Sequence, residues 1–142
     1  IDAIVAPRAV FELIEAFYAL RVSTRSAPDS APPTRLKLRT EVLSGTWEVL
    51  ATGQADLAIG GAGETSQAAG IQCEPLGELT LVFAVAPHHP LAALPEPLDG
   101  ETIAAHRIVA IADSARSFAP VTTGVQPGQD VLTMPSLAAK LE

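Results

Sequence analysis

Strand-like and helical patterns alternate through the first 60 residues, and this order limits the folds open to the chain. The run 1–5 is apolar and β-branched, and 34–40 alternates leucine with basic residues, which is typical of strands. Apolar residues recur at helical spacing over 7–20, and a second helix is expected from Ser44 to a glycine end at Gly53. A further short apolar run at 56–60 completes the order strand, helix, strand, helix, strand, which predicts a parallel sheet with crossover helices.

The remainder of the chain continues as short elements separated by polar loops. Further strands are expected from four apolar runs: 71–76, 79–87, 107–112 and 131–134. The run 79–87 is almost entirely apolar, so we expect it to be buried on both faces. A helical turn is expected at 101–106, and Ser136 is expected to cap a final helix.

Charge and cysteine content exclude several classes of function. The 142 residues carry a formal net charge of −7, with nine basic against sixteen acidic side chains, which disfavours nucleic-acid binding by this chain itself. No apolar run approaches the roughly 20 residues of a membrane span, so no membrane partner is predicted. The single cysteine, Cys73, excludes an internal disulfide and a cysteine-rich metal site, and is expected to be an inert buried thiol.

The signals for catalysis are weak. His88 and His89 are adjacent, so they point apart and cannot chelate a metal as a helical i, i+4 pair would. Ser44 and Ser114 lack the glycine-flanked context of a catalytic nucleophile. The glycines that begin at Gly60 lack the pattern and the following helix of a dinucleotide site. The sequence therefore predicts no enzyme, no cofactor, no metal site and no catalytic residue.

Binding-site signals are stronger at the carboxyl ends of the expected parallel strands, where ligands bind in open α/β sheets. Thr46 and the free N–H groups at a helix start could hold a carboxylate or another anion. Ser44 and Thr46 could equally serve only as helix caps. Asp2 could contact a ligand amine or hydroxyl, or hydrogen-bond the neighbouring loop. Trp47 is expected in the core rather than as a ligand platform.

Three segments in order resemble the LysR-type transcriptional regulators. Within 35–60, Gly53 and the Asp-Leu-Ala-Ile run at 56–59 match a pattern of the family's effector-binding domain. Residues 81–92, with the His-Pro-Leu-Ala turn that begins at His89, resemble its central strand and the turn that follows. Residues 131–141 resemble the short strand and helix that precede a glycine-rich segment of the family.

This resemblance implies an α/β, periplasmic-binding-protein-like fold of two Rossmann-like lobes with mixed, mostly parallel sheets. Residues 1–76 would form an incomplete lobe one, and residues 77–142 a crossover strand and lobe two. The family binds a small-molecule effector between the lobes and controls transcription in the cytoplasm. DNA is bound only through a winged helix-turn-helix domain, which we expect to lie, with the C-terminal part of lobe one, outside this piece of the protein.

The resemblance also implies a homodimer or tetramer, with helix 7–20 and strand 34–40 on the dimer face. It implies effector-binding residues from both lobes: Asp2, Ala3, Ile4, Ser44, Gly45, Thr46, Gly60, Gly61, Asp113, Ser114, Thr133 and Ser136. Asp2 favours an effector that carries a hydrogen-bond donor. Two alternatives remain: a periplasmic-type solute-binding protein of the same architecture, and a small α/β enzyme, for which no catalytic pair can be assembled.

Overall fold

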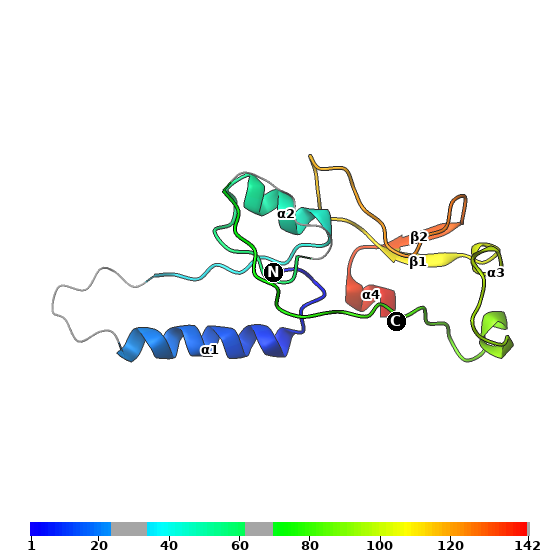
Figure 1. Ribbon diagram of the computed structural model, residues 1–142, viewed down its shortest axis with the longest axis horizontal. Coiled ribbons are helices and arrows are strands. Elements are labelled where there is room, and N and C mark those ends of the chain that lie inside the picture. The colour runs from blue at the N-terminus through cyan, green and yellow to red at the C-terminus, as the bar shows by residue number, and fades with distance from the viewer. Residues whose placement is uncertain (24–33, 62–69, 142) are drawn as a thin grey trace.

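The computed structural model describes residues 1–23, 34–61 and 70–141 (Figure 1). These residues form short elements joined by long irregular segments. In chain order the elements are α1 (Pro7–Ser23), α2 (Ser44–Ala51), the 3₁₀ helix η1 (Pro90–Ala93), α3 (Gly100–Ala104), β1 (Ile108–Ile111), β2 (Val131–Met134) and α4 (Leu137–Leu141). The composition also predicts a proline-rich loop at 22–33 and a loop rich in Gly, Ala and Ser at 61–70, and both lie mostly outside the described residues.

Strands β1 and β2 pair in parallel, with Ile108 opposite Val131 and Ile111 opposite Met134. Helix α4 follows β2 and packs against both strands. Ser136 accepts the N–H of Ala139 at 3.1 Å, so its predicted role as the cap of this helix is confirmed. The β1 and β2 predictions are confirmed as well, and the chain is α/β with a parallel pair of strands.

The prediction of three regular strands in the first 60 residues is wrong, although the ends of the three segments contact one another through backbone hydrogen bonds. A single parallel bridge joins Asp2 and Glu41. The Asp2 N–H donates to the Ile59 carbonyl at 2.8 Å, and the Ala3 N–H donates to the Glu41 carbonyl at the same distance. Leu38, in the expected second strand, is half exposed. A ladder needs continuous neighbours and a covered face, and here only the strand ends have them.

The two strands expected at 71–76 and 79–87 are also wrong. This segment is extended but forms no ladder with the described residues, and it runs as a single thread from the region of α2 towards η1 (Figure 1). Leu76 and Val82 are each 78% exposed, so the expected burial on both faces does not occur. Cys73 is exposed, which corrects the expectation of a buried thiol.

The helical predictions fare better because helices satisfy their own backbone groups. α1 covers the expected 7–20 and extends to Ser23, but Phe11 and Leu13 on it are exposed. The break at His88 and His89 becomes η1, where His89 Nδ1 accepts the Leu91 N–H at 3.2 Å. α3 begins at Gly100, one residue before the expected turn, with Asp99 as its N-cap.

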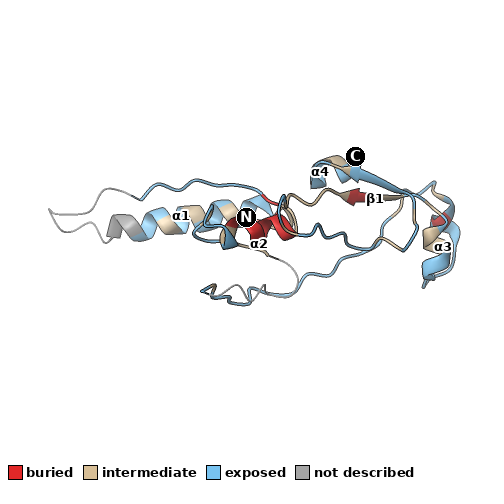
Figure 2. Cartoon of the chain, turned by 90° about the horizontal axis from the view of Figure 1, so that it is seen from above, coloured by how far each residue is buried: buried red, intermediate tan, exposed pale blue. Residues whose placement is uncertain are grey.

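Buried residues gather around α2 rather than in an apolar core (Figure 2). Among the described residues the buried apolar side chains are Val49, Leu91 and Ala110. Five buried residues are polar or charged: Asp2, Glu41, Ser44, Thr46 and Glu48. No described helix has the length and apolar character that crossing a membrane requires. The centre of the structure is therefore a polar cluster around one short helix.

Candidate functional site

The N-terminus of α2 is capped by a carboxylate from far along the chain. Leu43 occupies the N-cap position, and its side chain makes no capping hydrogen bond. Instead, the Asp113 carboxylate accepts the N–H groups of Ser44 and Gly45, each at 3.2 Å. The expectation that Ser44 or Thr46 caps this helix is therefore wrong, because Asp113 takes the exposed N–H groups at the positive end of the helix.

Thr46 and Asp2 form a buried pair beside that cap. The Thr46 hydroxyl donates to Asp2 Oδ2 at 2.7 Å, and Asp2 Oδ1 accepts the Ile4 N–H at 3.1 Å. Thr46 is fully buried and Asp2 is 1% exposed. Of the two roles considered for Asp2, the structure shows the hydrogen bonds to its neighbours.

Ser114 joins the segment after β1 to the residues before α2. Its hydroxyl donates to Glu41 Oε2 at 2.6 Å and accepts the Val42 N–H at 2.8 Å. Glu41 also forms an ion pair with Arg39, whose Nη1 donates to Gln54 Oε1 at 2.9 Å. The buried Glu41 carboxylate is thus held by a guanidinium on one side and a hydroxyl on the other.

Glu48, one turn into α2, binds the backbone of the segment that follows Ser114. Its Oε2 atom accepts the N–H groups of Arg116, Ser117 and Phe118, at 2.9, 2.8 and 2.9 Å. The N–H of Phe118, then that of Ser117, holds the pKa of this carboxyl below its ordinary value.

The pKa of Asp113 is lowered as well. Burial raises it, but the N–H groups of Val121 and Ala115 and the donors at Ser44 outweigh that effect. Two ionised carboxylates therefore tie the segment 113–121 to α2.

Glycines at the site allow close approach of the backbone. A Cβ at Gly45 would overlap the Ser114 hydroxyl, and one at Gly60 would overlap the Val5 side chain. A Cβ at Gly61 would lie 2.9 Å from the Trp47 ring. Trp47 is itself only partly buried, so its expected place in the core is met in part. The glycines are required here because side chains or backbone already fill the space.

The structure brings most of the predicted binding residues to this cluster but not all of them. Six of them form direct contacts in this cluster or adjoin such contacts: Asp2, Ser44, Gly45, Thr46, Asp113 and Ser114. Four more flank these residues: Ala3, Ile4, Gly60 and Gly61. Thr133 lies in the β1–β2 ladder, and Ser136 caps α4. Both are exposed and form none of these contacts. Their role in binding stays a prediction.

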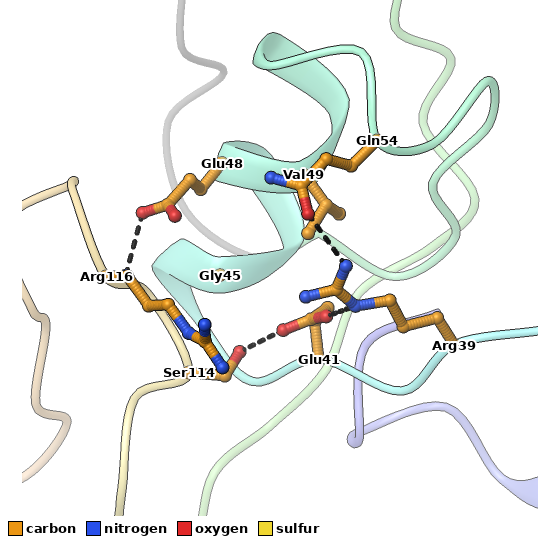
Figure 3. Close-up of a pocket in the computed structure, with 8 residues that line it drawn as sticks. All are labelled: Arg39, Glu41, Gly45, Glu48, Val49, Gln54, Ser114 and Arg116. Carbon is orange, nitrogen blue, oxygen red and sulfur yellow. Dashed lines mark hydrogen bonds and ion pairs between the residues drawn. The ribbon is translucent and has the colours of Figure 1, made fainter.

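A polar pocket of about 270 Å³ opens on one side of α2 (Figure 3). Its charged and polar side chains are Arg39, Glu41, Glu48, Gln54, Ser114 and Arg116. Of these, the sequence predicted only Ser114 as an effector-binding residue. Glu41 directly follows an expected strand, which could have pointed to it, whereas no local pattern marks Arg116, because its place depends on contacts with α2. The described residues contain no cluster of histidine, cysteine or carboxylate groups suited to a metal ion.

Comparison with known proteins matches this chain to one family. The model of the LysR substrate binding domain matches residues 26–142. The chain is 36% identical over 130 residues to the uncharacterized HTH-type transcriptional regulator YeeY of Escherichia coli K12, covering 92% of this chain and 39% of that protein.

Two further relatives agree with this match. The chain is 32% identical over 110 residues to the HTH-type transcriptional activator AllS of Klebsiella pneumoniae, covering 78% of this chain and 41% of that protein. It is 36% identical over 107 residues to the probable HTH-type transcriptional regulator YhaJ of Escherichia coli K12, covering 75% of this chain and 36% of that protein. The chain thus spans about two fifths of these relatives. No solved structure matches the chain significantly.

Proposed function

The chain belongs to the family of LysR substrate-binding domains, and from this premise we propose that it senses a small metabolite on behalf of a transcriptional regulator. The family match over residues 26–142 carries the proposal. The relatives are named as HTH-type transcriptional regulators, not as enzymes. The contacts between α2 and residues 113–121 support it, because they gather predicted binding residues from distant parts of the chain.

The contacts around α2 are suited to a ligand-dependent change. Asp113, Ser114 and Glu48 connect α2 and the residues just before it to the segment 113–121 through hydrogen bonds, and Val49 is the only buried apolar side chain among the described residues of α2. A hydrogen bond to a charged group contributes about 1.5–3 kcal/mol net of the bonds to water that replace it, which is within the range that ligand binding can offset. A ligand that binds one arrangement more tightly than another would therefore shift the balance between them.

We extend the proposal to the architecture and the assembly. Residues 1–76 and 77–142 would contribute to two lobes of a periplasmic-binding-protein-like fold, with the effector between them. The regulator would act in the cytoplasm as a homodimer or tetramer and bind DNA through a separate domain. The net charge of −7 on this chain agrees with DNA binding by a separate domain, because binding to DNA phosphates needs basic residues.

The test is a thermal-shift screen of the chain against amino acids, aromatic acids, purines and sugar acids. A ligand at 100 times its dissociation constant should add about 2.7 kcal/mol to the free energy of unfolding. Thr46→Val should weaken the shift, because the fully buried Thr46 hydroxyl holds Asp2 in place against the start of α2, among the predicted binding residues. Thr122→Val, at an exposed threonine, is the matched control.

A second experiment distinguishes the proposed regulatory function from that of a solute-binding protein. In the intact regulator that carries this domain, the same ligand should change occupancy of its DNA site. A ligand that stabilises the chain but leaves DNA occupancy unchanged would favour the solute-binding alternative. A screen without any stabilising ligand would contradict ligand sensing by this chain.

A further inference from the structure

The pocket beside α2 holds two arginines that approach it from different segments (Figure 3). Arg39 comes from the residues before α2, and Arg116 from the segment after β1. The whole chain contains nine basic residues and carries a net charge of −7. The two guanidinium groups share this pocket with the carboxylates of Glu41 and Glu48, so both donors and acceptors for a charged ligand lie in one place.

The backbone of Arg116 is held by a hydrogen bond, whereas its guanidinium can bind a ligand. Its N–H and those of the next two residues bind Glu48 Oε2, which anchors this stretch to α2. Within residues 1–23, 34–61 and 70–141, its guanidinium forms no hydrogen bond or ion pair. A guanidinium presents paired N–H donors that match a carboxylate or a phosphate.

The two carboxylates at the pocket already accept hydrogen bonds or ion pairs from the protein. Glu41 is paired with Arg39 and accepts the Ser114 hydroxyl. Glu48 uses only its Oε2 atom for three N–H groups. Among the described residues no donor reaches Glu48 Oε1, so this oxygen can accept a hydrogen bond from a ligand.

We propose that this pocket binds the carboxylate of a small hydroxy acid or amino acid, with Arg116 on the carboxylate and Glu48 Oε1 accepting the ligand hydroxyl or ammonium. Arg39, held by Glu41 and Gln54, lines the same pocket. The volume of about 270 Å³ lies just under the range of typical ligand pockets, which suits a small metabolite. This inference rests on the proposed sensing function and names the chemical class of its ligand.

Binding at this pocket would also strengthen the contact that it bridges. Glu48 lies on α2 and Arg116 on the segment after β1, so a ligand that contacts both adds an interaction between them. The arrangement with Glu48 bound to residues 116–118 is then favoured over one in which they separate.

Calorimetric titration of the intact chain at constant ionic strength tests the proposal with four probes: malate, succinate, the neutral diamide of malate, and inorganic phosphate. We expect malate to bind more tightly than succinate, which lacks the hydroxyl, and the diamide not to bind. Phosphate binding that equals malate binding would overturn the carboxylate assignment.

Variants locate the site. Arg116→Gln should weaken malate binding by about tenfold or more, because a charge-assisted bidentate contact is lost. Arg116→Lys should retain part of the affinity, since it keeps the charge but loses the fork. Arg8→Gln removes an equal charge from the exposed face of α1 and should bind malate as the native chain does. Circular dichroism confirms that each variant is folded.

The outcomes separate this inference from the function on which it rests. Malate binding that Arg116→Gln leaves unchanged, or no malate binding at all, overturns the assignment of this pocket. If another metabolite from the screen then stabilises the chain in a Thr46-dependent manner, the sensing function stands and only the ligand class is wrong. If neither malate nor any screened metabolite binds, both proposals are wrong.

Discussion

At Gly45 the space that a side chain would need is already occupied. A Cβ there would overlap the Ser114 hydroxyl and would lie 3.0 Å from the backbone of Ser114 and Ala115. The same hydroxyl binds both Glu41 and the Val42 N–H. One glycine thus allows a segment almost 70 residues away to lie against the start of α2.

Gly45→Ala should lower the free energy of unfolding by roughly 1–3 kcal/mol, because an extra methyl group is forced into filled space. Ser114→Ala should also destabilise, since the Val42 N–H loses its acceptor. The double variant should lose less than the sum of the two, because Ser114→Ala removes the atom that the added methyl group strikes. Urea unfolding of the three variants measures this coupling, and strictly additive losses would contradict the contact.

Glu48 provides a second test at the scale of one residue, through pH. Hydrogen bonds from Phe118, Ser117 and Arg116 lower its pKa in the folded chain. Its contribution to stability is therefore fully present above the pKa of the unfolded chain, and is lost as pH falls through the lower folded value.

Amide exchange at residues 116–118 measures that contribution. Protection should hold at neutral pH and fall in acid, on the low side of the ordinary glutamate range. Glu48→Gln should reduce protection at neutral pH and remove the acid-dependent step. Glu12→Gln, at an exposed helix position, is the control and should change neither. An acid-dependent step that persists in Glu48→Gln would assign the effect to another group.

At the scale of the element, α2 depends on what stabilises its two ends. It has eight residues, and helices this short are marginal in water by themselves. At its C-terminus Gly53 adopts φ +69°, and the N–H groups of Gly53 and Gln54 return to the carbonyls of Leu50 and Val49. These contacts form a Schellman motif, as expected from the glycine in the sequence.

Asp113→Ala should lower stability by about 1 kcal/mol, since the helix loses the acceptor at its N-terminus. Gly53→Ala should lower the free energy of unfolding by roughly 1–2 kcal/mol, because alanine is strained in the left-handed backbone conformation. No atom lies near the added Cβ, so a steric clash contributes nothing to this loss. The exposed Asp56→Asn is the matched control. Thermal unfolding compares them, and a native-like Asp113→Ala would show that the cap adds nothing.

At the scale of the whole molecule, apolar surface outweighs apolar core. Leu79, Leu81 and Val82 are 65–78% exposed in one extended segment without a ladder partner among the described residues. Phe11 and Leu20 of α1 are also exposed. Continuous exposed apolar surface marks places where protein surfaces associate.

The chain by itself should therefore associate as its concentration rises, with 79–83 protected in the assembly. Val82→Lys should weaken association, because a charge on the segment opposes burial in an interface. Leu57→Lys, at a similarly exposed leucine outside this segment, is the control. Sedimentation velocity over a concentration series measures the effect. A chain that stays monomeric throughout would contradict this use of the segment.

Local patterns in the sequence determined α1, α2 with its glycine end, β1, β2, the cap of α4 and the family. The helices and caps depend on hydrogen bonds between near neighbours, and the two strands and the family are marked by short apolar runs or motifs, so the order of residues is enough. Tertiary structure alone decided that Asp113 caps α2, that Glu48 binds residues 116–118, and that Arg116 reaches a pocket. It also left the apolar segment 71–87 without strand partners among the described residues, because a strand must find its hydrogen bonds in another part of the chain.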